Sequence, residues 1–171
     1  MIKSLLTAAL LTLSLPLSAP ANEWDEHRQL MRSLRNVGVS VYINDPSVCS
    51  RNIDGRYWSS RRRLDVCQDN HTKPYVQVRW TQNDLDTLRH EAHHVIQDCM
   101  DTPFDGRLRP LFSSDEQWES FVSNAMTVDQ AKHILSHYPT DKARTELEAF
   151  AVARTVNADV IANKLEEFCG V

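Results

Sequence analysis

The segment RHEAHHV at residues 89–95 constrains the fold of this chain more than any other feature. It lies in a stretch that predicts a helix from Thr81 to Asp101, because apolar residues recur there at three- and four-residue spacing: Leu85, Leu88, Ala92, Val95, Ile96 and Cys99. Four residues make slightly more than one helical turn, so His90 and His94 project from one face. Burying two imidazoles beside the carboxylate of Glu91 is costly unless these groups are satisfied. The segment therefore predicts a metal ion held by His90 and His94.

Glu91 follows the first of these histidines directly, so its carboxylate lies beside the same helix face. From there it can accept a proton from a water that attacks a carbonyl, and pass that proton to the leaving amine. The His-Glu-x-x-His spacing is a signature of zinc metallopeptidases. His93 points away from the face of His90 and His94, and we interpret it as a residue that packs or contacts a ligand, not as a ligand itself.

A catalytic zinc site needs a third protein ligand, because three ligands and one water complete its usual coordination. The residues after the motif, VIQDCM at 95–100, lack the Gly and the third His that metzincins carry there. The stretch TELEAFA at 145–151 instead resembles the second signature of gluzincin peptidases, in which a Glu ligand precedes two variable residues and an Ala. Glu146 matches the ligand position of that pattern and shares a helix face with its Ala. Glu148 is the alternative third ligand.

Over roughly residues 75–156 the chain thus resembles the HExxH zinc metallopeptidases of the zincin-like superfamily, most of all the small gluzincins of the minigluzincin type. The resemblance implies Zn²⁺ as cofactor, a peptide or protein substrate, and hydrolysis by zinc-activated water with Glu91 as general base. Phe150 departs from the pattern, because many relatives carry an Asp there that orients a ligand histidine. Gln97, Asp98 and Asp101 are the candidates for that orienting role. The alternative function is an exported, disulfide-bonded zinc-binding or interaction module without catalysis.

The remaining pattern predicts a single α+β domain over residues 22–171, in which a small N-terminal strand region packs on a mostly helical half that carries the active-site helix. An amphipathic helix is expected at Glu23–Arg35, with Asn22 as its cap. Strands are expected at Val37–Ile43 and Tyr75–Trp80, with a third at Leu64–Cys67. Further helices are expected at Asp115–Met126, Val128–His137, Lys142–Val156 and Asp159–Phe168. Zincin-like peptidases bind substrate along an edge strand, so Tyr75–Trp80 is either such a strand or an ordinary one.

The first 21 residues predict a signal peptide, and hence a periplasmic or secreted protein. Lys3 precedes an apolar stretch, and Ala19-Pro20-Ala21 has the small-x-small pattern of a cleavage site, so cleavage is expected after Ala21. The apolar stretch is short for a membrane span, and no later segment approaches about 20 apolar residues, so no stable membrane insertion is expected.

The four cysteines all follow the predicted cleavage site, and an even count in an exported chain favours disulfides. Of the three possible pairings, the sequence favours Cys49 with Cys67, which closes a local loop. The other pair is then Cys99 with Cys169, which ties the C-terminal segment to the end of the central helix. A cysteine zinc site would need closely spaced C-x-x-C pairs, and the chain has none.

Charge and the remaining histidines set further limits. A formal charge of −4, with acidic and basic residues interspersed, argues against a nucleic-acid partner. His133 and His137 stand four residues apart with no carboxylate between them, so they are interpreted as surface or packing residues. His137 or Tyr138 could reach the metal site and stabilise a developing oxyanion. The sequence indicates neither substrate specificity nor oligomeric state.

Overall fold

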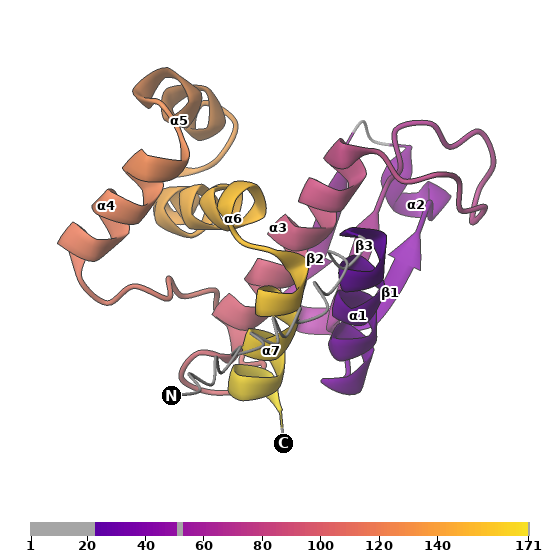
Figure 1. Cartoon of the computed structure of the whole chain (residues 1–171), viewed down its shortest axis with the longest axis horizontal. Coiled ribbons are helices and arrows are strands. Elements are labelled where there is room, and N and C mark those ends of the chain that lie inside the picture. The colour runs from indigo at the N-terminus through magenta and orange to yellow at the C-terminus, as the bar shows by residue number, and fades with distance from the viewer. Residues whose placement is uncertain (1–22, 51–52, 171) are drawn as a thin grey trace, which may run out of the picture.

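The helix α3 (Gln82–Cys99) runs through the middle of the molecule, with the sheet and α1 on one side and α4, α5 and α6 on the other (Figure 1). The computed structural model describes residues 23–50 and 53–170. Its other elements are α1 (Glu23–Asn36), β1 (Ser40–Ile43), α2 (Pro46–Cys49), β2 (Gly55–Trp58), the 3₁₀ turn η1 (Ser59–Arg61), β3 (Arg63–Val66), α4 (Asp115–Ala125), α5 (Val128–Leu135), the 3₁₀ turn η2 (Thr140–Lys142), α6 (Ala143–Thr155) and α7 (Ala158–Cys169). The α+β class is therefore confirmed. The signal peptide and the Asn22 cap were predicted for residues that lie outside the described part.

The sheet has three strands in the order β1-β3-β2, so β1 and β2 are its edges. β1 runs parallel to β3, and β2 runs antiparallel to it. The strand predicted at Val37–Ile43 begins only at Ser40, because Gly38 adopts a φ of 85° and turns the chain at the end of α1. The third predicted strand, Leu64–Cys67, is β3 to within one residue.

The strand predicted at Tyr75–Trp80 is wrong, since this segment forms no strand in the structure. Side-chain amides of the preceding segments satisfy its backbone instead of a neighbouring strand. Asn44 donates to the carbonyl of Val76 at 2.7 Å, while Gln68 accepts from the N–H of Val78 at 2.8 Å and donates to its carbonyl at 3.0 Å. The alternating pattern therefore marks an extended segment held by two amides.

β2 and α2 were not anticipated, because Asp54-Gly55 and Asn44-Asp45-Pro46 look like turns in the sequence. In β2, Gly55 lies so close to α3 that a Cβ there would meet Thr87 Cγ2 at 2.5 Å. Glycine is thus needed for the strand to approach the helix. The N-cap of α2 is Asp45, whose side chain accepts from the N–H of Ser47.

The helices predicted in the second half of the chain are all present to within two residues at either end. Side-chain caps explain several of these limits. Thr81 and Asp84 form a capping box at the start of α3, and Thr127 and Gln130 form another at the start of α5. Ser114 caps α4 through the N–H of Gln117.

Two apolar clusters flank α3 and fix its position. The larger cluster joins α1, α3, α7 and the sheet, and includes Leu30, Leu34, Leu64, Leu88, Ile96, Ile161 and Leu165. The smaller one joins α4, α5 and α6, and includes Val122, Met126, Ile134, Leu147 and Ala151. Between them α6 packs directly on α3, where the fully buried Ala149 allows a close approach. The polar face of α3 therefore lies against α6.

The structure has the two disulfides that the sequence favoured. Cys49–Cys67 ties α2 to the end of β3, and Cys99–Cys169 joins the ends of α3 and α7. Two disulfides indicate an oxidising, exported environment. Within residues 23–50 and 53–170, none of the helices combines the length and the apolar character that crossing a membrane requires.

Candidate metal centre

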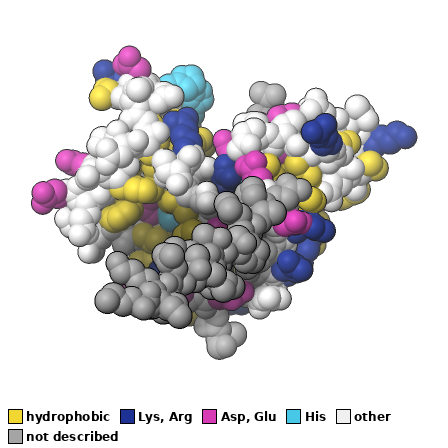
Figure 2. All heavy atoms as spheres, viewed as in Figure 1, with side chains coloured by type: hydrophobic (Ala, Val, Ile, Leu, Met, Phe, Trp, Pro, Cys, Tyr) yellow, Lys and Arg dark blue, Asp and Glu magenta, His cyan; other side chains and the backbone are white. Residues whose placement is uncertain are grey.

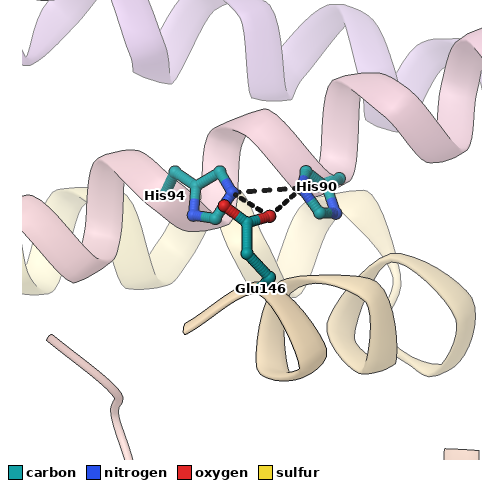
Figure 3. A group of neighbouring side chains, drawn as sticks. All are labelled: His90, His94 and Glu146. Atoms are coloured by element: carbon teal, nitrogen blue, oxygen red, sulfur yellow. Dashed lines mark hydrogen bonds and ion pairs between the residues drawn. The ribbon is translucent and has the colours of Figure 1, made fainter. Parts of the chain in front are cut away.

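α3 and α6 bring together three side chains that could hold a metal ion: His90, His94 and Glu146. The Nε2 atoms of the histidines lie 3.0 Å apart, and Glu146 Oε2 lies 3.4 Å from the first and 3.3 Å from the second. Figure 3 shows the carboxylate of Glu146 rising from α6 towards both rings on α3. All three residues are buried, with exposed fractions of 7%, 5% and 6%.

The spacing of these atoms fits a tetrahedral ion. Zinc ligands at the usual distance of about 2.0–2.1 Å from the metal are about 3.3 Å from one another in tetrahedral geometry. Glu146 Oε2 has no hydrogen-bond partner although it is buried, so this oxygen is free to accept a metal. Two imidazoles and one carboxylate form a donor set that zinc accepts.

The charges of the site also favour a cation. Burial by itself would raise the pKa of Glu146, but the interactions with His90 and His94 outweigh burial and lower that pKa to about 2. Burial lowers the pKa of His90 to about 4. At neutral pH the site therefore presents the carboxylate of Glu146 and the neutral imidazole of His90, the protonation states in which both groups bind metal. For His94, burial by itself would lower the pKa, but the carboxylates of Glu146 and Glu91 outweigh burial and raise that pKa, so a metal ion must displace a proton there.

Glu91 lies beside this group, on the side of β2. Its side chain is buried, with an exposed fraction of 7%. A Cβ on Gly55 would come within 3.1 Å of Glu91 Cγ, so the bare backbone of β2 leaves the space that Glu91 occupies. Burial raises the pKa of Glu91 to about 7, and the nearby backbone N–H of Tyr57 acts in the opposite direction. A carboxylate with such a pKa is suited to proton transfer near neutral pH.

Gln97 orients the ring of His94. Its amide nitrogen donates to the carbonyl of Thr145 and to Glu148 Oε1, both at 3.1 Å, and both of these groups can only accept. Its amide oxygen must therefore face His94, whose Nδ1 lies 2.8 Å away and donates to it. This leaves the lone pair of His94 on Nε2, which points to the metal site. Of the three candidates for an orienting residue, Gln97 is the one that contacts a histidine of the group.

Asp98 and Asp101, the other two candidates, have different partners. Asp98 accepts from the hydroxyl of Tyr57 at 2.8 Å and from the N–H of Gly106 at 2.8 Å. Asp101 is exposed and forms an ion pair with Arg109. These two residues anchor β2 and the loop after α3, and they do not touch a ligand histidine.

Glu148, the alternative third ligand, lies in a separate buried network. His93 Nε2 lies 2.8 Å from Glu148 Oε1, and the N–H of Leu111 donates to the same oxygen at 2.9 Å. His93 and Glu148 are both fully or almost fully buried, at 2% and 0% exposure. His93 thus packs away from the metal group as expected, and Glu148 supports Gln97 from behind.

Phe150 contacts the ring of His90, with ring centroids 4.3 Å apart in an edge-on arrangement. The Nδ1 atom of His90 is buried and has no hydrogen-bond partner. The two histidines of the group therefore differ: an amide contacts His94, whereas an aromatic ring packs against His90.

Tyr138 and His137 are placed differently. Tyr138 is half-buried and lies 6.2 Å from Phe150 between ring centroids. Burial, together with the carboxylates of Glu146 and Glu91, raises its pKa to about 12, so its hydroxyl stays protonated near the metal group. His137 is exposed, and its Nδ1 donates to the carbonyl of His133 at 2.9 Å. Exposed histidine side chains are visible over α5 in Figure 2, on the outside of the molecule.

The edge strand beside α3 is β2, and it takes the position that the sequence had assigned to Tyr75–Trp80. No signal in the sequence identified it, because its four residues, GRYW, neither alternate nor follow a clear apolar run.

A family model described as a domain of unknown function (DUF8637) matches residues 14–170, and the chain belongs to this family. No curated protein and no solved structure matches the chain.

Proposed function

We propose that this member of the DUF8637 family is an exported zinc metallopeptidase of the gluzincin type. The observation that carries the proposal is the convergence of His90, His94 and Glu146 at spacings of 3.0–3.4 Å, next to a buried Glu91. Three protein ligands that leave a fourth position open are typical of catalytic zinc, whereas structural zinc has four.

Each residue of the group has a distinct role in this proposal. His90, His94 and Glu146 would hold the ion, and bound zinc would supply a Lewis acid that polarises a carbonyl and lowers the pKa of water. Glu91 takes the proton from the attacking water and returns it to the leaving amine, a task suited to its pKa of about 7. The hydroxyl of Tyr138 donates a hydrogen bond to the oxygen of the scissile carbonyl as negative charge develops there, and it keeps its proton.

The substrate backbone would lie along β2. This strand is an edge of the sheet and contacts α3, so an extended peptide can pair with its free side. Because Gly55 brings β2 next to Glu91, a peptide on this edge would pass over the metal group.

The rival function is a zinc-binding module without catalysis, which would put a fourth protein ligand in place of the water. His93 does not take that position, because its Nε2 faces Glu148. His133 and His137 do not take it either, since both are exposed at the end of α5. The three-ligand arrangement therefore supports the catalytic proposal.

The first experiment is metal analysis by mass spectrometry on the purified full chain. We expect near-stoichiometric zinc that is lost in His90→Ala, His94→Ala and Glu146→Ala. Glu148→Ala tests the alternative third ligand, and it should keep more zinc than Glu146→Ala does, because Glu148 reaches the site only through Gln97. Absence of zinc after loading with excess metal would refute the proposal.

The second experiment separates catalysis from metal binding. Glu91→Gln should keep its zinc and lose turnover of a fluorescein-labelled casein substrate, since the amide cannot accept the proton. Equal turnover in Glu91→Gln and wild type would exclude Glu91 as the base, and zinc without any turnover in wild type across a peptide library would favour the non-catalytic module.

A further inference from the structure

A groove of about 610 Å³ lies between α1 and the segment that contains Gln77, away from the metal centre. Met31 and Ile43 form apolar parts of its wall, and Arg28, Arg32 and Arg35 line it from α1. None of its lining residues belongs to the metal group. The volume is in the range of sites that bind ligands.

The charge of the groove is opposite to that of the whole chain. Its three arginines are exposed and follow one another along the same side of α1, whereas the chain carries a formal charge of −4. Figure 2 shows Lys and Arg side chains gathered over α1. Arg28 forms a surface ion pair with Asp25, but Arg32 and Arg35 have no ion pair within the described part of the chain. The groove thus offers two unpaired guanidinium groups.

The free edge of β1 runs beside this groove. Ser40 donates its N–H to the carbonyl of Arg62, and Asn44 donates its N–H to the carbonyl of Val66. Along β1 every second residue therefore turns its backbone N–H and C=O groups towards β3, and the residues between turn theirs away. Val41 and Ile43 therefore turn their N–H and C=O groups away from β3, where no described residue pairs with them. Ile43 is also part of the wall of the groove, so the end of β1 and the arginines border the same space.

We propose that this groove binds an extended peptide segment with acidic residues at alternate positions, which adds to β1 as a fourth strand. Arg28 and Arg32 are four residues apart, or about 6 Å along the helix axis. Alternate side chains of an extended strand are about 7 Å apart and point to the same side. Two acidic residues separated by one other residue can therefore reach both guanidinium groups while the peptide backbone pairs with Val41 and Ile43. The Asp25 carboxylate holds Arg28 in the free protein, and the peptide displaces it.

The test uses the full chain and a fluorescein-labelled octapeptide of alternating Glu and Thr. Fluorescence anisotropy should show binding that weakens as salt rises, with no binding of the matching Lys-Thr octapeptide. Arg28→Ala and Arg32→Ala should each weaken binding roughly fivefold or more. Arg107→Ala is the matched control, an exposed arginine outside the groove, and should bind as wild type does.

Amide exchange measured by NMR tests the strand addition. The amides of Val41 and Ile43 should exchange more slowly when the Glu-Thr peptide is bound. The proposal is overturned if the peptide does not bind, if the arginine variants bind it unchanged, or if heparin binds with the same arginine dependence while the peptide leaves both amides unprotected. A second copy of this chain is the other possible occupant of the groove. The proposal is overturned if the chain is a dimer that dissociates in Arg32→Ala and that the peptide does not compete with. Glu91→Gln should bind the peptide normally, so failure here is distinguishable from failure of the peptidase proposal.

Discussion

Replacing Gln97 by leucine tests how the metal centre is built, because the amide of Gln97 connects His94 to α6. The variant loses the bond to His94 Nδ1 at 2.8 Å and two bonds at 3.1 Å to Thr145 and Glu148. Removing a partner that orients a ligand histidine typically weakens metal binding about 10- to 100-fold. Since a tenfold change is about 1.4 kcal/mol, the expected loss is about 1.4–2.8 kcal/mol of binding free energy.

The same substitution also leaves buried polar groups without a partner, at about 1–3 kcal/mol for each, so the metal-free variant should be less stable as well. Gln68→Leu is the matched control, because Gln68 is also a buried amide, at 1% exposure, and its bonds go to Asn44 and Val78, outside the metal group. Competition with a chromophoric zinc chelator gives the affinity, and urea unfolding of metal-free protein gives the stability. Wild-type affinity in a folded Gln97→Leu variant, or an equal loss of affinity in Gln68→Leu, would refute the reasoning.

Three further predictions concern stability. Removing the Cys99–Cys169 disulfide with alanines opens a loop of 70 residues and should lower the free energy of unfolding by about 4 kcal/mol in urea titrations. Burial first, and then the charge of Arg89, lower the pKa of His27, so the unfolded chain binds more protons than the folded one. The free energy of unfolding should therefore fall as pH drops below the ordinary histidine pKa of 6.5, and it should fall less in His27→Gln. Burial raises the pKa of Glu91 from 4.5 to about 7, so the folded chain keeps a proton that the unfolded chain releases. As pH rises between those two values, the free energy of unfolding of metal-free wild type should fall by up to about 3 kcal/mol. Thermal unfolding of Glu91→Gln should show no such loss.

The strands show where local patterns were insufficient. The alternation at Tyr75–Trp80 predicted a strand, but a strand needs a neighbour with free backbone groups, and here the amides of Asn44 and Gln68 take that place. β2 was missed for the opposite reason, since a Gly-containing stretch with no alternation became a strand because it pairs with β3 and packs on α3.

The choice between Glu146 and Glu148 shows the limit at the site itself. Helical spacing and the gluzincin resemblance ranked Glu146 ahead of Glu148, but neither could tell which face of α6 meets α3. The packing of α6 on α3 turns Glu146 towards His90 and His94, and Glu148 towards His93. Gln97, Asp98 and Asp101 were equivalent candidates in the sequence, and their contacts separate them only in the folded protein.

The sequence alone determined the central helix, the pairing of His90 with His94 on one face, and the order of the later helices. These features depend on residues three or four positions apart, whose relative placement the α-helix itself sets. Tertiary structure alone decided the course of the strands, the partner that orients His94, and the groove beside β1. Each of these depends on which distant segments meet, and that is settled by the packing of the whole core and not by any local pattern.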